Sequence, residues 1–166
     1  MDLTRHIDGW TVNSLDDMPL NGQFIEIIFA GDISSEPHKS TFKKTYDFLT
    51  SPKSAITKYN GKPPKNEGWD FEDIYTPSEA NRQKLIDVFV VHTAHHLDVE
   101  LRPDFELWKY RFYEDVDGAQ HKRLGIDPEG ITVAIVRPDG MVGLVCSADE
   151  MGEKVPAYFD KVLTKK

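Results

Sequence analysis

Apolar residues along this chain are gathered into short runs that polar turns separate, a pattern that indicates a domain with several buried strands. The run at 131–136, ITVAIV, is β-branched or apolar at almost every position. Such continuity is typical of a strand whose two sheet faces are both covered. The sequence Arg137-Pro138-Asp139-Gly140 then favours a tight turn, and a second apolar run returns at 141–146. Together these features predict a β-hairpin in the middle of a covered sheet.

Two more apolar runs predict buried strands at 23–29 and 85–92. Between them, Ser34 or Ser35 is expected to cap a helix that begins near Pro37, where a missing N–H costs nothing. The residues that share one face of this helix are Phe42, Thr45, Tyr46 and Leu49.

The remaining segments carry weaker patterns. Residues 4–21 are predicted to be irregular. The segment 108–113 alternates large rings with basic residues, which indicates a half-exposed or edge strand. Further predictions are a short helix at 118–124, a connection at 147–152, and a C-terminal helix from about 155 with Pro156 in its first turn.

The order of these elements, β-α-β, then a loop, then β-α-β-β-α, predicts an α/β fold. Specifically, it predicts a thioredoxin-like sandwich with a mixed sheet, a C-terminal hairpin and a closing helix. We expect one domain over 1–166, with a long loop insertion at about 51–84 that includes a short helix at 78–84.

Composition excludes several classes of partner and location. The net charge of −8 disfavours nucleic acid as a partner, because an acidic surface repels phosphates. No apolar run approaches the roughly 20 residues that span a bilayer, and no secretory signal is recognised at the start, so a cytoplasmic protein is expected. The single cysteine, Cys146, lies in a predicted strand and is expected to be buried, which excludes an intrachain disulfide.

Three segments together resemble the C-terminal domain of the FAD-dependent phenol hydroxylase family. They are Arg5-His6-Ile7-Asp8-Gly9, Phe29-Ala30-Gly31-Asp32, and Leu124-Gly125-Ile126-Asp127-Pro128 running into Val136-Arg137-Pro138-Asp139. The resemblance implies a thioredoxin-like domain that lies behind a flavin-binding part, contributes to dimerisation and does not hold the flavin. No GxGxxG follows a strand here, so neither FAD nor any other cofactor is expected, and the hydroxylase activity is not carried over.

Thiol chemistry is excluded by residue type. Redox work in a thioredoxin-like fold needs a thiolate at the start of the helix after the first strand. This chain has AGDISS at 30–35 there, without a cysteine.

The same region remains a favourable place for a ligand, since open α/β sheets bind ligands beyond the carboxyl ends of their strands. Acid/base candidates follow two neighbouring strands, and we expect them to converge: Asp32, Glu36 and His38 after the first strand, and His92, His95 and His96 after the second. The alternative is a solvated loop with ordinary surface histidines. A metal site at these histidines is less favoured, because they follow a strand and form no HExxH or HxxEH pattern, so no metal is expected.

Aromatic residues of the long loop, Trp69, Phe71 and Tyr75, are candidates for a lid over a flat phenolic ligand, with Thr93 beside it. They could instead simply cover the sheet. Tyr110, Phe112 and Tyr113 are expected to pack on the sheet or to form a dimer surface.

Two functions follow. The first is a small cofactor-independent enzyme of secondary metabolism that acts on a phenolic or polyketide-like metabolite by proton transfer. Isomerisation, or cyclisation by addition of a phenol oxygen to an alkene, would suit such a site. The second is a non-catalytic dimerisation or accessory module for a flavin-dependent enzyme. In both cases we expect a homodimer.

Overall fold

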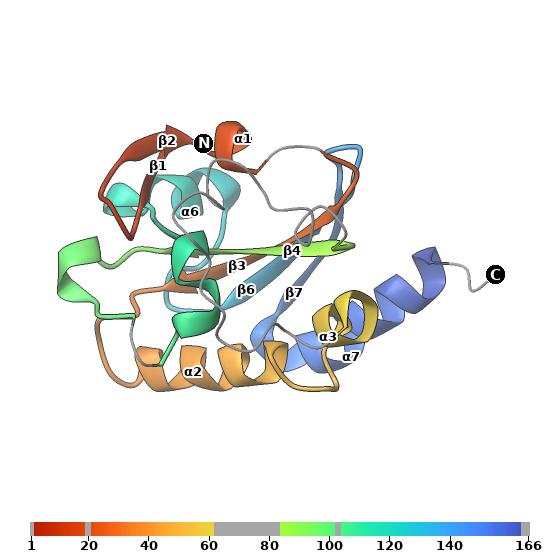
Figure 1. The fold of residues 1–166 in the computed structure, drawn as a ribbon. Helices are drawn as coiled ribbons and strands as arrows, with labels where there is room; N and C mark the ends of the chain where they lie inside the picture. Colours follow the sequence, from red (N-terminus) through yellow and green to blue (C-terminus); the bar gives the residue numbers. More distant parts are fainter. Residues whose placement is uncertain (1, 19–20, 62–83, 102–103, 164–166) are drawn as a thin grey trace.

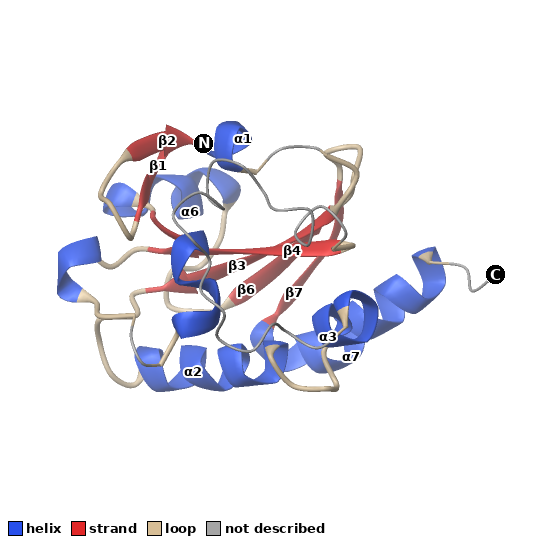
Figure 2. Ribbon diagram, in the orientation of Figure 1, coloured by secondary structure: helices blue, strands red, loops and turns tan. Residues whose placement is uncertain are grey.

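A computed structural model describes residues 2–18, 21–61, 84–101 and 104–163. Within them, a mixed sheet of seven strands has the order β2-β1-β5-β4-β3-β6-β7 (Figures 1 and 2). The strands are β1 (Asp2–Arg5), β2 (Thr11–Asn13), β3 (Phe24–Gly31), β4 (Ile86–His92), β5 (Phe112–Glu114), β6 (Thr132–Val136) and β7 (Val142–Ser147). The helices are α1 (Ser14–Asp17), α2 (His38–Leu49), α3 (Ala55–Asn60), α6 (Ala119–Leu124) and α7 (Ala148–Val162). Three short 3-10 segments are η1 (His96–Asp98), η2 (Glu106–Arg111) and η3 (Val116–Gly118).

The central strands have the thioredoxin-like arrangement. Strand β3 pairs with β4 in parallel and with β6 in antiparallel orientation, and β6 forms a hairpin with β7. Helices α2, α3 and α7 lie on one face of this sheet and α6 lies on the other (Figure 1). The predicted fold class, with its C-terminal hairpin and closing helix, is therefore confirmed.

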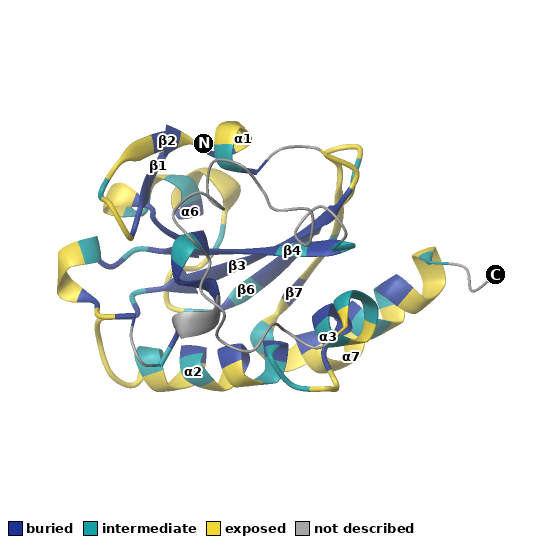
Figure 3. Ribbon diagram, viewed as in Figure 1, coloured by how far each residue is buried: buried dark blue, intermediate teal, exposed yellow. Residues whose placement is uncertain are grey.

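The buried residues form two clusters, and the ribbon in Figure 3 is dark blue along the central strands that contribute to both. One cluster joins alternate residues of the central strands, such as Ile28 and Val90, to Phe42 of α2 and Phe159 of α7. The other joins the intervening residues, such as Ile27, to the N-terminal strands. Since all eight positions of β3 are buried, its sequence shows no alternation of apolar and polar residues.

Glu26 is the exception inside β3. Its side chain lies on the same face as Phe24 and Ile28 and is only 1 % exposed. Neither carboxyl oxygen has a hydrogen-bond partner among the described residues. Because burial penalises the charged form, the pKa of Glu26 rises from its ordinary 4.5 to about 8.

The N-terminal segment is more regular than expected. Residues 4–21 were predicted to be irregular, but the chain forms β1, β2 and α1 before residue 18. The two strands pair with each other, and β1 also pairs with β5. Arg5 ties them to α1 through a buried ion pair with Asp17, with Arg5 Nε 2.5 Å from the carboxylate. Strands of four and three residues are too short to produce a readable period, so only long-range pairing defines them.

The prediction of an edge strand at 108–113 is wrong. This segment is η2 followed by β5, and β5 lies inside the sheet between β4 and β1. The basic residues do not face solvent: Lys109 and Arg111 are buried, and the Arg111 guanidinium lies 4.8 Å from the centre of the Phe89 ring. Tyr113 and Phe112 are core residues, as the sheet-packing interpretation expected.

The hairpin at 131–146 exists, but its place in the sheet differs from the prediction. Strand β6 is internal, whereas β7 is the last strand and pairs with β6 alone within the described chain. Met141, Val142 and Val145 are 63 %, 61 % and 56 % exposed. The turn between the strands is closed by the Gly140 N–H, which donates to the Arg137 carbonyl at 2.8 Å.

Helix α7 begins earlier than predicted. The segment 147–152 was expected to be a connection, but Ser147 and Glu150 form a capping box that starts the helix at Ala148. Pro156 consequently lies inside the helix and not in its first turn. At α2 the N-cap is Pro37, without a side-chain bond, so the predicted serine cap is also wrong.

The predicted loop at 51–84 contains helix α3, and Asn60 at its end bonds the start of β4 by accepting from the Leu85 and Ile86 N–H groups. Residues 62–83, which include most of the helix predicted at 78–84, lie outside the described residues. As expected, Cys146 is buried, and burial raises the pKa of its thiol. In the described part of the chain no helix is both long and apolar enough to cross a bilayer.

Candidate functional site

The carboxyl ends of β3 and β4 adjoin, as expected for parallel neighbours. Gly31 lies opposite His92 in the sheet register, and the Thr93 N–H donates to the Gly31 carbonyl at 2.9 Å. The loops that carry the predicted acid/base residues therefore start side by side.

Beyond this point the side chains divide into two groups. Glu36 and His38 line a hollow at the start of α2, whereas His92, His95 and His96 belong to a histidine cluster near β5. Asp32 is hydrogen-bonded to Ser34 and not to either group. Its carboxylate accepts from the backbone N–H and from the hydroxyl of Ser34. These bonds are the main reason that the pKa of Asp32 is lowered.

Thr93, the predicted substrate-binding residue, lies against η3, where a Cβ on Gly118 would be 3.7 Å from the Thr93 methyl group. The other three predicted binding residues, Trp69, Phe71 and Tyr75, lie outside the described residues. Of the six acid/base candidates, Glu36 and His38 thus line this hollow in the described part of the chain, whereas Asp32, His92, His95 and His96 are not among its lining residues.

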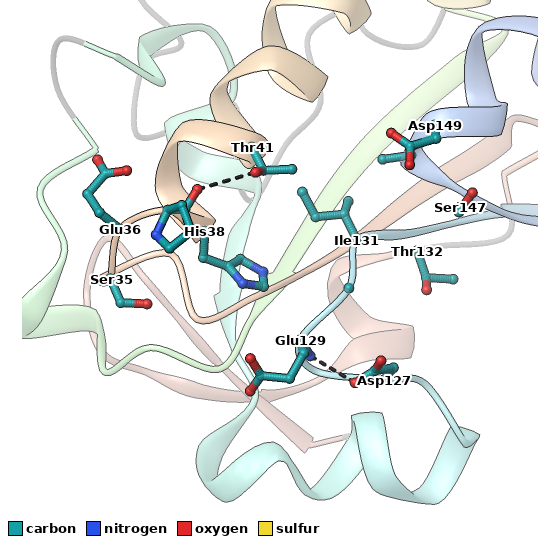
Figure 4. A pocket seen from close by; sticks show the side chains of 13 residues that line it. Ser35, Glu36, His38, Thr41, Asp127, Glu129, Ile131, Thr132, Ser147 and Asp149 are labelled. Carbon is teal, nitrogen blue, oxygen red and sulfur yellow. Dashed lines mark hydrogen bonds between the residues drawn. The ribbon is translucent and has the colours of Figure 1, made fainter.

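The hollow has a volume of about 660 Å³ and lies between the start of α2, the loop before β6 and the start of α7 (Figure 4). Its polar lining consists of Ser35, Glu36, His38, Thr41, Asp127, Glu129, Thr132, Ser147 and Asp149. With four carboxylates and one imidazole, it is an acidic site. Asp127, Glu129 and Asp149 were not among the predicted residues, because they follow α6 or begin α7 and reach the hollow only in the folded chain.

Gly31, at the end of β3, allows Pro128 and His38 to approach the backbone closely. It has a φ of +64°, and a Cβ there would lie 2.1 Å from the Pro128 carbonyl oxygen and 2.5 Å from His38 Nε2. His38 Nε2 is a buried atom without a hydrogen-bond partner among the described residues. The imidazole is therefore held close to the backbone, with one nitrogen not committed to the fold.

The histidine cluster includes His6 of the N-terminal segment, which the sequence analysis did not select. His6 Nε2 is 3.0 Å from the Val99 carbonyl oxygen, which can only accept, so this nitrogen carries the proton. His6 Nδ1 then accepts from His92 Nε2 at 3.0 Å. Because His92 is fully buried, its pKa falls to about 3, and burial lowers the pKa of His6 as well. Both rings are neutral parts of the core at physiological pH.

Glu114 is the second residue that the sequence analysis missed. It ends β5, opposite His92 in the register, and its side chain is buried. Glu114 Oε2 lies 2.6 Å from His96 Nδ1 and accepts from the His96 backbone N–H at 3.0 Å. The ring of exposed His95 stacks on that of His96, with 4.5 Å between their centres. The misassigned strand at 108–113 concealed this carboxylate, since only β5 places it beside the end of β4.

A third surface combines apolar and charged side chains. Along β7 and the end of α7, a groove of about 610 Å³ is lined by Phe24, Arg137, Pro138, Asp139, Val142, Gly143, Tyr158 and Val162. It adjoins the exposed outer edge of β7, where the backbone N–H and C=O groups on one side face away from β6.

Comparison with known proteins finds a matching family and two fungal relatives. The model of the family described as "Phenol hydroxylase, C-terminal dimerisation domain" matches residues 1–166. The chain is 27% identical to the FAD-dependent monooxygenase terD of Aspergillus terreus, over 99% of this chain and 27% of that protein. It is 28% identical to the phenol 2-monooxygenase fsqG of Aspergillus fumigatus, over 90% of this chain and 25% of that protein. The chain thus spans about a quarter of the length of these fungal relatives.

Among solved structures, the exposed lipoprotein thioredoxin Etrx1 from Streptococcus pneumoniae is similar, with a TM-score of 0.47 and 13% identity. The similarity covers 95% of this chain and 98% of that one.

Proposed function

Because the chain belongs to the family of phenol hydroxylase C-terminal dimerisation domains, we propose that it is a self-association module in which the β7 edges of two copies pair. The observation that carries this proposal is the exposed apolar edge of the sheet. Proteins usually protect such an edge with lysine, proline or a covering segment. The strand Val142–Ser147 contains neither lysine nor proline, and Val142 and Val145 are more than half exposed.

Antiparallel pairing of two β7 strands produces an interface with two-fold symmetry, since each copy contributes the same residues. The sheets of the two copies then continue into one another, and the outward backbone groups of β7 bond to the partner's strand. The groove beside β7 would be covered in the same step, which removes the exposed Val142 and Val162 side chains from water.

A charge at the centre of this edge should prevent pairing. For Val145→Lys we expect the dimer dissociation constant to rise at least about a hundredfold, because two ammonium groups would meet near the symmetry axis. Analytical ultracentrifugation over a range of concentrations measures this constant. The matched control is Leu15→Lys, an exposed leucine of α1 beyond the opposite end of the sheet, which should leave the constant unchanged. A wild-type chain that stays monomeric, or a Val145→Lys variant that dimerises normally, would contradict the proposal.

A second function is favoured by His38. His38, Glu36 and Glu129 line one hollow, and His38 Nε2 has no hydrogen-bond partner among the described residues, a combination that suits acid/base catalysis (Figure 4). We infer a phenolic, polyketide-like substrate of secondary metabolism, and no cofactor is needed. One carboxylate takes the phenol proton while the oxygen bonds to an alkene carbon, and His38 acts as the acid that delivers a proton to the neighbouring carbon. The product is an isomer of the substrate, so the step balances without an oxidant.

Removal of His38 should abolish this activity. With an ortho-hydroxychalcone as the probe, whose ring closure is followed by absorbance, we expect the wild-type chain to accelerate cyclisation. His38→Ala should then lower kcat/KM at least about a hundredfold, the range for a lost acid or base. Asp47→Asn, on the exposed side of the same helix, is the control and should keep full activity. Equal rates with His38→Ala and wild type, or no acceleration by the wild type, would eliminate His38 as a catalytic residue for this probe.

A further inference from the structure

We propose that His95, His96 and Glu114 form a binding site for a divalent transition-metal ion. Each side chain offers one ligand atom, and these three atoms lie within 4.8 Å of one another. The site is distinct from the hollow at His38 and from the β7 edge, so it stands or fails independently of both proposed functions. It also differs from the sequence-based expectation of no metal, because Glu114 could not be placed beside the histidines from the sequence.

The fold holds the three ligands together through the backbone. Strands β4 and β5 are parallel, and the end of β4 at His92 lies opposite Glu114. The chain then turns back in η1, which is closed by the Asp98 N–H donating to the His95 carbonyl at 2.9 Å. This turn directs the His96 backbone N–H and ring toward Glu114 Oε2. The carboxylate is therefore oriented by two contacts from the residue that would share the ion with it.

The distances are suitable for closure around a small ion. Tetrahedral zinc with bonds of about 2.0–2.1 Å holds its ligand atoms roughly 3.4 Å apart. Glu114 Oε2 and His96 Nδ1 are 2.6 Å apart in a direct hydrogen bond, so they must separate by roughly 0.8 Å when an ion replaces the proton between them. His95 must move inward, and its exposed side chain is free to do so. Its Nδ1 accepts only one bond, from the Leu97 N–H at 3.2 Å, and its Nε2 stays available.

The neighbouring histidines support a site with three protein ligands and not more. The His6 ring lies 6.4 Å from that of His96, centre to centre. Both nitrogens of His6 are engaged, one with Val99 and the other with His92, so His6 keeps its place in the core. With three ligands the fourth position of the ion faces solvent on the side of His95, where water or a substrate group can bind.

The ligand set also selects the class of metal. Two imidazole nitrogens with a single carboxylate favour Zn²⁺, Co²⁺, Ni²⁺ or Cu²⁺, whereas Ca²⁺ and Mg²⁺ require mainly oxygen ligands. A bound ion would link η1 to β5, and this link adds to stability because the unfolded chain lacks the site.

The test uses the whole chain and the metals alone. Isothermal titration with ZnCl₂ should give one site per chain, and CoCl₂ should produce the visible absorption of a cobalt ion with low coordination number. Zinc should also raise the Tm, and excess EDTA should reverse the shift. MgCl₂ at the same concentration should give neither heat nor a Tm shift.

Two ligand variants and one control test the assignment. His95→Ala and Glu114→Gln should each weaken zinc binding at least about tenfold, which is what loss of even an outer-shell partner of a metal site costs. His38→Ala removes a histidine from the other site and should bind zinc as the wild type does. Tm values measured in EDTA show whether each variant is folded. Zinc binding that is weaker than millimolar, that involves several equivalents, or that declines equally in His38→Ala and His95→Ala would overturn the proposal.

Discussion

Replacement of Glu26 by methionine is expected to raise the free energy of unfolding at pH 8 by about 5 kcal/mol. The wild-type carboxyl is buried in β3, and its pKa is raised from 4.5 to about 8. The unfolded chain releases this proton above pH 4.5, while the folded chain retains it up to about pH 8. The stability that the bound proton represents is therefore fully present below pH 4.5 and is lost as the pH rises through 8.

The size of the effect follows from the difference between the two pKa values. Each pKa unit is worth about 1.4 kcal/mol, so the interval from 4.5 to 8 corresponds to about 5 kcal/mol. Methionine has a similar length and no charge to desolvate. Below pH 4.5 the gain should shrink to about 1 kcal/mol, the cost of an unbonded but neutral carboxyl group.

Urea denaturation at pH 4.5, 6.5 and 8 measures this difference. Glu26→Gln tests the charge separately, because glutamine cannot ionise but keeps a buried polar group. This variant should lose the pH dependence of stability, and its free energy of unfolding at pH 8 should rise by less than that of Glu26→Met. Glu153→Met, at an exposed position of α7, is the matched control and should show no such dependence. If the gap between Glu26→Met and wild type is the same at pH 4.5 and pH 8, Glu26 does not hold a proton in the fold.

A second large effect is expected on acidification, and its origin is His92. The folded pKa of His92 is lowered from 6.5 to about 3, first through burial and then through the neighbouring His6. The unfolded chain takes up a proton below pH 6.5, whereas the folded chain does not. Stability is therefore complete above pH 6.5 and is lost as the pH falls toward 3, by about 5 kcal/mol in all. His6, whose pKa is also lowered, adds to the loss.

His92→Phe isolates this contribution. At pH 7.5 the variant should be less stable than wild type by roughly 1–3 kcal/mol, because His6 loses its hydrogen-bond donor. Between pH 7.5 and pH 4 the wild type should lose about 3 kcal/mol relative to the variant, so that the variant becomes equally stable or more stable, since phenylalanine takes up no proton in either state. The control is His95→Phe, at an exposed position, which should not change the acid dependence. Parallel stability curves for His92→Phe and wild type would refute a buried neutral His92.

These two groups act in opposite directions. Between pH 4.5 and 6.5, the loss of stability from Glu26 on raising the pH is offset by the gain from His92. We therefore expect these two residues together to leave the free energy of unfolding of the wild type constant between pH 4.5 and 6.5. They should lower it below pH 4.5 and above pH 6.5.

The central sheet could be predicted because its strands carry their signal locally. The runs at 23–29, 85–92 and 131–136 are apolar enough to identify β3, β4 and β6 without knowledge of their partners. Strands β1, β2 and β5 have three or four residues each, and they exist because Arg5, Tyr113 and their neighbours pair across the chain. No local pattern of that length distinguishes a strand from a turn.

The candidate site was predictable only as a location. That the loops after β3 and β4 adjoin follows from parallel pairing, and on this ground Asp32, His38 and His92 were expected to converge. Their side chains nevertheless separate, because His92 turns into the core toward His6 while His38 stays at the surface hollow. The direction in which a side chain points at the end of a strand depends on which residues the following elements bury. That information is not contained in the local sequence.

By itself, the sequence determined the fold class, the three long central strands and the family of the chain, because these follow from residue type and short-range pattern. Only the tertiary structure decided that β7 is an exposed edge, that Glu26 is sealed in the core, and that Glu114 meets His95 and His96. Each of these depends on residues far apart in the chain. Burial and proximity are properties of the packed assembly, and they set both the pKa values and the surfaces available for binding.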